Sequence, residues 1–532
     1  MAKVYKVMAK VPAKVPSPKR KVAVSARIRA GKERRIWIAI LSIRRITVGN
    51  PKFAFWKRRS HLTDLVVDMI PPDFSYIQKI LLPLFYTIQM SVTGTVLGIF
   101  FALVLSPFGA AHLGFPAVIR RILRIVIQIL RSFPALILAL TATFLFGLGT
   151  FAGTFAIALY TFAIMTKLTY EDASAAGKKA YQALRAMGTW KYAAYIHGIL
   201  PEIIPGFLTN ALYLLETNVR HSSILGYVGA GGIGLLLNEK ISWLEYDKVG
   251  TILLMLFLTV CVIEYFSRYL AALIRKERTI KKEQARLLLL FLAGLFLICT
   301  FTLSLPDFSR TSPQTLRNMF AGFLQPDWSF FFSAEKDGLG YLLLETVCIA
   351  FIGTVIGAIV SAPLAFLNTK RFVPAPVSFL FNLVIMVIRS VPFLVYGLIF
   401  IRVSGPGAFT GVLTLAVCSI GLLTKRFTEA LDALDPRPYH ALLAMGVRPL
   451  PAICHSVLPQ LKPVFTSIIL YRFDVNIREA SVLGLVGAGG IGAPLIFSMN
   501  QYDWEKAGAI MLGLILLVWV IDMVSEKTGA GN

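Results

Sequence analysis

Long apolar runs alternate with short polar or glycine-rich connections along most of the chain. A helix that crosses the hydrocarbon core of a bilayer needs about 20 apolar residues. Runs that reach or approach this length lie at residues 81–105, 118–147, 151–167, 203–237, 249–273, 287–305, 341–366, 377–402, 407–424, 461–495 and 507–524. The pattern predicts an all-α polytopic membrane protein with about 11 transmembrane helices, in a range of about 10–12.

The second half of the chain repeats the first. A shift of 258 residues aligns Gln182–Gly234 with His440–Gly492 without a gap, and 25 of these 53 positions are identical. We therefore expect two copies of one membrane module. The predicted domains are a basic N-terminal arm, a first module, a basic cytoplasmic joint and a second module, at residues 1–60, 61–275, 276–286 and 287–532.

The order of the predicted spans also indicates how the modules are oriented. Six spans separate the polar loop at 168–200 from its equivalent at 426–458, so both loops are expected on one side of the membrane. The modules are therefore parallel repeats rather than inverted ones. The first module has no clear counterpart of the run at 287–305. The segment in that place, residues 34–46, is either an interfacial segment or a degenerate first helix.

Composition supports a membrane protein, because 56% of the residues are hydrophobic and only 15% are charged. The net charge of +26 is concentrated at the start, where residues 1–80 contain 19 Lys or Arg and four acids. Such an arm favours contact with anionic membrane lipid. It lacks the interleaved aromatic residues of a single-strand binder, so we expect no nucleic-acid partner. The five cysteines show no CxxC spacing, and no metal site is expected.

The sequence GAGGIG occurs twice and fits the dinucleotide-binding pattern G-x-G-x-x-G. Both copies lie among long apolar runs instead of following a strand, which argues against a nucleotide site. Within a membrane helix, glycines permit close packing or a local break. We expect a hinge or packing segment beside a transport path, formed by Gly229, Gly231, Gly232, Gly234, Gly487, Gly489, Gly490 and Gly492.

Both polar loops share one motif, in which a segment of small residues reaches a glycine and Leu-Pro follows twelve residues later. Its residues are Gln182, Ala183, Gly188, Leu200 and Pro201 in the first loop, and His440, Ala441, Gly446, Leu458 and Pro459 in the second. A short helix that ends near the glycine can fit a groove of a partner protein, and the proline suits the start of the next helix. The motif resembles the cytoplasmic coupling loop of ATP-binding-cassette (ABC) importer permeases. The glutamate that usually begins the loop is replaced here by Gln182 and His440.

Further segments narrow the resemblance to one subfamily. Leu212–Gly234, Thr428–Gly446 and Tyr471–Gly492 resemble the phosphonate-type ABC permeases, as do the arginines in LRSFPAL and IRSVPFL. The family form continues with a glutamate after that proline, whereas this chain has Ala135 and Phe393. The resemblance covers roughly 60–275 and 287–525.

This resemblance implies a fused permease subunit, in the inner or plasma membrane of a bacterium, that imports phosphonates or related phosphorus oxyanions such as phosphite and phosphate. It implies no catalytic residue and no cofactor in this chain, which also lacks a P-loop. ATP and Mg²⁺ would be bound by two copies of a partner ABC ATPase, one on each coupling loop. An extracytoplasmic substrate-binding protein would deliver the substrate.

Several polar residues within or beside apolar spans form a candidate substrate path: Arg131, Asn218, Arg220, Arg389, Asn476 and Arg478. Charges in such positions usually face the protein interior or water. Guanidinium groups bind phosphonate and phosphate oxygens in a bidentate way. In the alternative interpretation, the arginines extend to the membrane interface or pair with Glu216 and Asp474.

Two other functions remain open. The first is an ABC permease for another small solute, such as methionine, a quaternary amine or a sulfonate. The second is a secondary transporter or channel that works without ATP. Inverted repeats and intramembrane carboxylates, which are typical of secondary transporters, are largely missing.

Overall fold

The computed structural model describes residues 63–64, 67–274, 282–304, 306, 313–333, 335 and 338–529. These residues belong to one of the chain's two compact units, Phe53–Asn532. The predicted basic arm and most of the predicted joint at 276–286 lie outside the described residues. So does the segment 34–46.

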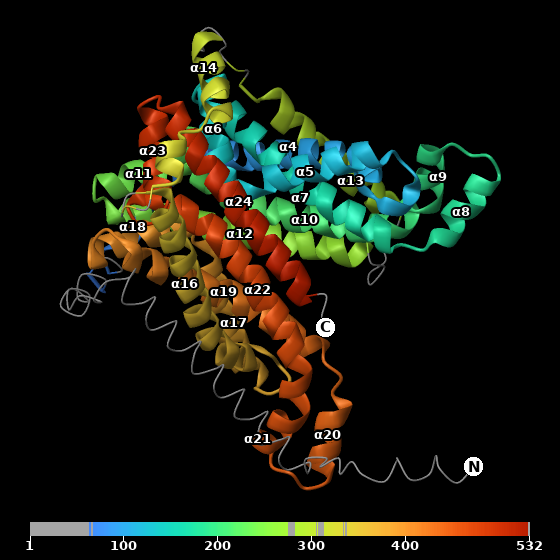
Figure 1. Ribbon diagram of the computed structural model, residues 1–532. Coiled ribbons are helices and arrows are strands. Elements are labelled where there is room, and N and C mark those ends of the chain that lie inside the picture. The colour runs from blue at the N-terminus through green and yellow to red at the C-terminus, as the bar shows by residue number, and fades with distance from the viewer. Residues whose placement is uncertain are drawn as a thin grey trace, which may run out of the picture. The chain divides into compact units, whose positions relative to one another are not determined.

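Helices make up the described part of both modules, and strands are absent from it (Figure 1). The helices of the first module are α4 (Ile77–Gly109), α5 (Ala117–Ser132), α6 (Ala135–Phe146), α7 (Thr150–Ala175), α8 (Lys178–Ala186), α9 (Lys191–Gly198), α10 (Leu200–Leu225), α11 (Ile233–Ser242) and α12 (Tyr246–Ile274).

The second module follows the same order, with additional helices at its start. Its helices are α13 (Lys282–Phe301), α14 (Pro313–Leu324), α15 (Trp328–Phe331), α16 (Leu339–Asn368), α17 (Ala375–Ser390), α18 (Phe393–Ser404), α19 (Ala408–Ala433), α20 (Arg437–Ala444), α21 (Pro449–Ala452), α22 (Leu458–Leu483), α23 (Gly492–Asn500) and α24 (Trp504–Gly529).

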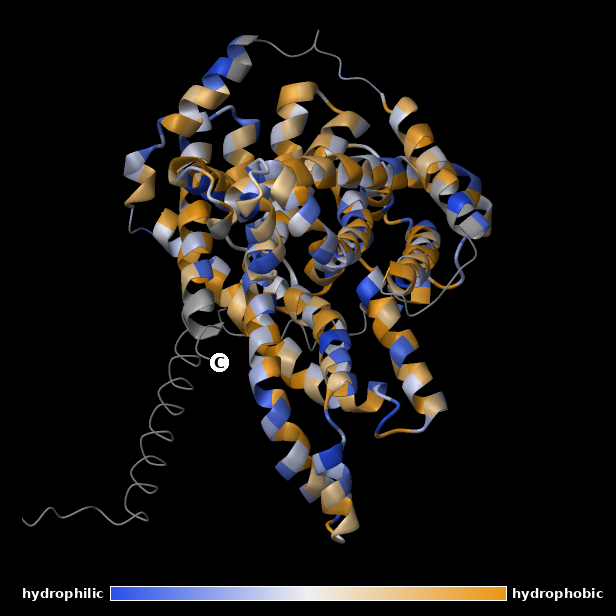
Figure 2. Ribbon diagram, turned by 90° about the vertical axis from the view of Figure 1, so that its right-hand side faces the viewer, coloured by the Kyte–Doolittle hydropathy of each residue, from blue (hydrophilic) through white to orange (hydrophobic). Residues whose placement is uncertain are grey.

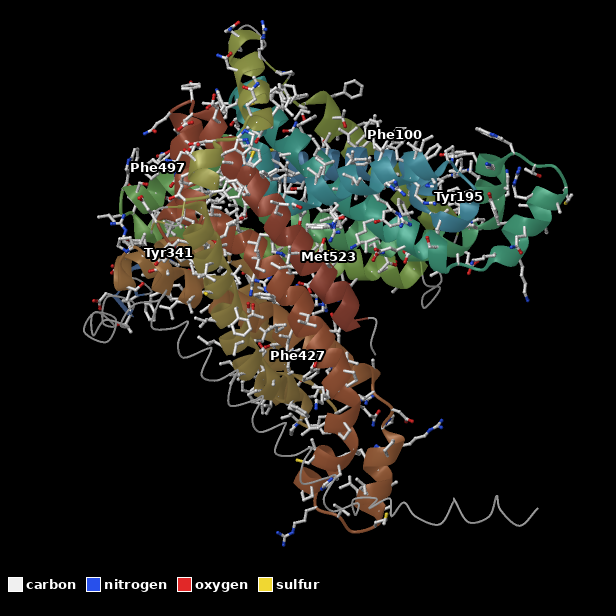
Figure 3. The ribbon with its side chains drawn as sticks, in the orientation of Figure 1. Phe100, Tyr195, Tyr341, Phe427, Phe497 and Met523 are labelled. Carbon is white, nitrogen blue, oxygen red and sulfur yellow. The ribbon has the colours of Figure 1, made fainter. Side chains whose placement is uncertain are left out.

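Among the described residues, seven helices are long and apolar enough to cross a membrane, or ten spans if each of three bent helix pairs counts as one. In addition, α13 contains a shorter apolar stretch, Leu292–Phe301. Apolar residues cover much of the helical surface (Figure 2). Phe100 on α4 is 59% exposed, whereas Phe427 on α19 is completely buried (Figure 3). These features confirm the prediction of an all-α polytopic membrane protein with an internal repeat.

Two predicted spans, 118–147 and 377–402, are wrong as continuous helices. The first breaks between α5 and α6 with a bend of 96°, and the second between α17 and α18 with a bend of 86°. Pro134 and Pro392 cap the second helix of each pair in an extended conformation. A proline disfavours helical geometry in the residue before it and lacks an N–H, so it ends one helix and starts the next. The motif shared by the two modules therefore forms a corner.

Close approach between helices explains one glycine in each module. A Cβ atom on Gly98 of α4 would lie 2.6 Å from the carbonyl oxygen of Ala158 on α7. A Cβ atom on Gly357 of α16 would lie 2.4 Å from Cβ of Ser419 on α19. Any side chain at either position would push the two helices apart.

The first helix of the predicted second module, α13, contacts the first module. The Gln89 amide on α4 donates hydrogen bonds to the Cys299 carbonyl (3.1 Å) and to the Thr302 hydroxyl (2.8 Å). The hydroxyls of Thr150 and Ser304 lie 2.9 Å apart. The opening helix of the second module thus packs on the first.

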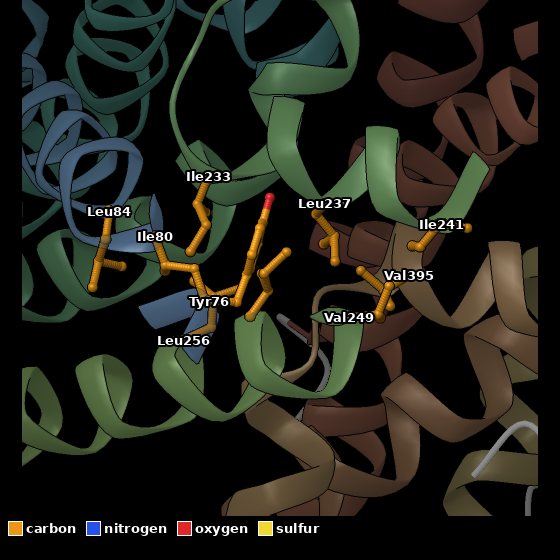
Figure 4. Close-up of a cluster of buried hydrophobic side chains, with 10 residues drawn as sticks. Tyr76, Ile80, Leu84, Ile233, Leu237, Ile241, Val249, Leu256 and Val395 are labelled. Carbon is orange, nitrogen blue, oxygen red and sulfur yellow. The ribbon is translucent and has the colours of Figure 1, made fainter. Parts of the chain in front are cut away.

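A buried apolar cluster also joins the modules (Figure 4). Most of its side chains come from η1 (Phe74–Tyr76), α4, α11 and α12 of the first module, and Val395 of α18 comes from the second. Tyr76, Ile233 and Leu237 are among its members, and Val395 is completely buried. Close packing of such side chains stabilises helix association in a membrane protein through van der Waals contacts. The cluster therefore supports the modules as one packed body.

Candidate functional site

A cavity of about 1120 Å³ lies between the two modules. Its walls come from α5, α6, α7 and α10 of the first module and from α17, α18, α19, α22 and α24 of the second. Besides His221, seven arginine or lysine and four acidic side chains line it: Arg131, Lys167, Arg220, Arg389, Arg426, Arg472, Arg478, Glu171, Asp474, Glu479 and Asp522. All four arginines of the predicted path are therefore brought to one cavity.

Arg131 and Arg389 each lie in the last turn of the helix before a proline corner. The negative end of the helix dipole favours a cation at this place. Arg389 Nη2 lies 3.1 Å from Glu216 Oε1 and Nη1 lies 3.3 Å from Glu264 Oε1. Arg131 Nη1 lies 3.7 Å from Asp522 Oδ2. Each of these pairs joins one module to the other.

Arg220 and Arg478 occupy equivalent places on α10 and α22. Arg220 Nη1 lies 2.9 Å from Glu216 Oε1, and Arg478 forms an ion pair with Asp474. Arg478 Nη1 also donates to the carbonyl of Arg131 at 3.2 Å. Both side chains line the cavity, and each pairs with the acid four residues earlier, as the alternative interpretation of the sequence expected.

The structure does not bring Asn218 and Asn476 to the cavity, although the sequence placed them in the path. Both are completely buried. Asn218 Nδ2 donates to the hydroxyls of Thr95 (2.8 Å) and Thr161 (2.7 Å), and Asn476 makes the equivalent contacts in the second module. Residues two apart on a helix point in nearly opposite directions, so an asparagine two positions before a cavity arginine faces the neighbouring helices.

Sequence reasoning missed two acids within apolar runs, Glu264 on α12 and Asp522 on α24. Glu264 is only 3% exposed. It forms ion pairs with Lys425, whose Nζ lies 2.9 Å from Oε1, and with Arg389 and Arg268. The shift of 258 residues that defines the repeat also relates Glu264 to Asp522. An acid repeated at one position of an apolar helix was the signal that could have identified them.

The glycines of the two GAGGIG segments form loops that reverse the chain between α10 and α11 and between α22 and α23. Gly229, Gly231 and Gly232 have φ of 82°, 77° and 75°. In the second copy, Gly487, Gly489 and Gly490 have φ of 76°, 79° and 77°. Only glycine adopts this conformation without strain. The Gly149 N–H donates to the Gly229 carbonyl at 3.1 Å. The predicted interruption of both spans is present, and these glycines lie outside the residues that line the cavity.

The two predicted coupling loops form helical hairpins, α8–α9 and α20–α21, each of which extends beyond the long helices of its own module (Figure 1). Gly188 and Gly446 adopt φ of 84° and 81° where α8 and α20 end. The residues just before them, Met187 and Met445, are 80% and 78% exposed. Each hairpin thus exposes a large apolar side chain at its turn.

The other residues of the motif take the places that the sequence predicted. Gln182, Ala183, His440 and Ala441 are exposed on α8 and α20. Pro201 and Pro459 lie in the first turn of α10 and α22, directly after Leu200 and Leu458. The base of the first hairpin is fixed by the Tyr181 hydroxyl, which donates to the Leu113 carbonyl at 2.7 Å. Burial raises the pKa of Tyr181.

The chain matches the family described as "Binding-protein-dependent transport system inner membrane component" over residues 77–277 and 353–526. It belongs to that family and is a multi-pass membrane protein. Each matched region corresponds to one of the two repeats.

Relatives with assigned names match either most of this chain or a part of it. The chain is 27% identical to the phosphate-import permease protein PhnE of Mycolicibacterium smegmatis, covering 87% of this chain and 88% of that one. It is 36% identical to the phosphite transport system permease protein PtxC of Stutzerimonas stutzeri over 34% of this chain and 67% of that one. It is 37% identical to a putative cryptic phosphonate transport system permease protein, PhnE2, of Escherichia coli over 22% of this chain and 95% of that one.

Proposed function

We propose that this chain is the transmembrane permease of an ABC importer for phosphorus oxyanions, namely phosphonates, phosphite or phosphate. The observation that carries the proposal is the cavity between the modules, where arginine and lysine side chains outnumber acidic ones by seven to four. The names of the three relatives agree with this chemistry.

The cavity suits an oxyanion because arginine presents a planar set of N–H donors that matches two oxygens of a phosphonate group. Several of its arginines have low exposure, with side-chain values of 6% for Arg389 and 13% for Arg220 and Arg478, and electrostatic contacts are stronger where water is scarce. Arg131, Arg220, Arg389 and Arg478 each pair with an acid. A delivered anion would compete with those acids for the guanidinium groups, so binding does not leave a buried cation unpaired at any stage.

Coupling to ATP would use the two hairpins. One copy of a partner ABC ATPase would dock on α8–α9 and a second on α20–α21. The partner would bind ATP and Mg²⁺, and this chain would hold neither. An extracytoplasmic binding protein would capture the anion and release it into the cavity.

Uptake measurements test the proposal. The chain is expressed with its neighbouring ATPase and binding protein in cells that lack other importers for phosphorus anions. We expect uptake of radiolabelled phosphate, phosphite or methylphosphonate that requires all three components. Uptake of methionine, a quaternary amine or a sulfonate in place of these anions would contradict the proposed substrate class. Uptake without the ATPase would contradict the proposed mechanism.

A further inference from the structure

The charges that line the cavity do not follow the symmetry of the repeat. Arg426 lines the cavity, and the residue equivalent to it by the shift of 258 is Leu168, which also lines the cavity. Asp474 lines the cavity, whereas its equivalent, Glu216, does not. The two sides of the cavity, one around α10 and one around α22, therefore differ in charge.

Four of the seven arginine and lysine side chains are paired with acids that themselves face the cavity. These pairs are Lys167 with Glu171 (3.6 Å), Arg472 with Glu479 (2.8 Å), Arg131 with Asp522 (3.7 Å) and Arg478 with Asp474. Their formal charges cancel. An anion on the α22 side would meet a carboxylate beside each guanidinium, and like charges repel strongly where water is scarce.

The other three of these side chains are Arg220, Arg389 and Arg426, and their acidic partners lie outside the cavity lining. Glu216 holds both Arg220 (2.9 Å) and Arg389 (3.1 Å). Glu429 lies 3.1 Å from Arg426. The carboxylates thus position these guanidinium groups from behind and leave the cavity side with an excess of positive charge.

The three arginines lie around one helix. Tyr213 and Arg220 are seven residues apart on α10, which places them on the same face two turns apart. The Arg426 guanidinium lies 5.1 Å from the centre of the Tyr213 ring. Arg389 contacts the same helix through its ion pair with Glu216. One arginine of the first module and two of the second therefore meet at α10.

We propose that the transported oxyanion binds at this asymmetric position, held by Arg220, Arg389 and Arg426, and not on the symmetry axis between the modules. The inference rests on the proposed function and specifies the binding position within it. Three guanidinium groups without a facing carboxylate match the charge and the several oxygens of a phosphonate or phosphate. Arg426 distinguishes the two sides, because Leu168 stands at the equivalent place.

The repeat supplies matched variants for a test. Arg426→Leu makes the α10 side like the α22 side, and Leu168→Arg adds an arginine at the equivalent place. Arg426 and Glu429 are both about half exposed, with side-chain exposures of 47% and 48%, so the substitution leaves no buried charge unpaired. Glu429→Gln is the control that removes the partner acid and keeps the arginine.

The measurement is ³¹P line broadening of phosphite, phosphate and methylphosphonate by the purified full chain in maltoside micelles, without ATPase or binding protein. We expect Arg426→Leu to weaken binding roughly tenfold or more, as loss of a charge-assisted hydrogen bond requires. Glu429→Gln should bind at least as tightly as the parent. Leu168→Arg should not strengthen binding, and adding it to Arg426→Leu should not restore it.

Other binding results would contradict the asymmetric position or both proposals. Equal binding of the anions by the parent and by Arg426→Leu would overturn the asymmetric position. Restored binding in the variant that combines Arg426→Leu with Leu168→Arg would also overturn it, because the net charge of the cavity alone would then suffice. In both cases the parent still binds the anions, so the proposed function would stand. A parent that binds and imports none of the three anions would overturn both proposals.

Discussion

Arg389 of the second module lies 3.1 Å from Glu216 of the first, although the two residues are 173 positions apart in the chain. The same arginine also forms an ion pair with Glu264, with 3.3 Å between Nη1 and Oε1. In the other half of the repeat, the equivalent contact of Arg131 with Asp522 is longer, at 3.7 Å. The two modules are thus joined by buried ion pairs that are tighter on one side than on the other.

This difference predicts unequal effects of neutralising two equivalent acids. Glu264→Gln leaves Arg389 and Lys425 with one acid fewer in a buried place, so we expect a loss of about 3–5 kcal/mol in the free energy of unfolding. Asp522→Asn breaks a longer and more exposed pair and should cost about 1 kcal/mol or less. Unfolding of both variants by a denaturing detergent in mixed micelles measures the difference. Equal losses would contradict it.

Arg478 tests the neutralisation of Asp474 on the α22 side of the cavity. Arg478→Lys should reduce uptake and Arg478→Ala should reduce it further, because a weakened or missing partner leaves the Asp474 carboxylate to repel an anion in the cavity. The affinity of the separate binding protein for its ligand should stay unchanged, since that protein captures the anion elsewhere. Uptake kinetics and ligand binding are measured on the same preparations. If Arg220→Ala combined with Arg478→Ala transports as well as the parent in an intact complex, these arginines are structural.

The turn of the second coupling hairpin tests contact with the ATPase. A side chain at position 446 would meet no other atom within 4 Å, so substitution there acts through the backbone conformation. Gly446→Val should abolish ATPase association and uptake, because a β-branched residue strongly disfavours φ of 81°. Gly446→Asn should retain part of both, because asparagine tolerates this conformation. Co-purification of the ATPase gives the result.

Insertion of the chain must stay normal in these variants. The equivalent Gly188→Val should show the same loss, since intact docking at one hairpin does not replace the other. Full uptake by Gly446→Val would remove the coupling role of this loop.

The buried asparagines predict a stability effect. Asn476→Ala removes the amide that donates to Thr354 (2.6 Å) and Ser419 (2.9 Å), and we expect the chain to lose about 1–2 kcal/mol of stability. The relative uptake of phosphate, phosphite and methylphosphonate should not change. Thermal unfolding in micelles and competition uptake measure the two quantities. A change in selectivity would return this residue to the transport path.

The fusion of two modules predicts the composition of the working complex. One copy of this chain should associate with two copies of the ATPase, because the chain has two coupling hairpins. Native mass spectrometry of the purified complex counts the subunits. Two copies of this chain for each pair of ATPase subunits would contradict the prediction.

The amino-acid sequence by itself determined the features that depend on local pattern. Apolar run lengths located the spans, and the shift of 258 residues revealed the repeat. The spacing of Glu216 with Arg220 and of Asp474 with Arg478 indicated their ion pairs, because residues four apart on a helix are neighbours. The glycine in each polar loop predicted where a short helix ends, and α8 and α20 end two residues before Gly188 and Gly446.

The tertiary structure decided everything that depends on how distant segments pack. It decided which face of α10 meets the cavity, so that Arg220 lines the cavity and Asn218 does not. It also brought Glu264 to Arg389 across the modules. Such contacts join residues more than a hundred positions apart, and their geometry follows from the packing angles of whole helices. No periodicity within a single helix encodes those angles, so the partners of the cavity arginines could be identified only once both modules were folded together.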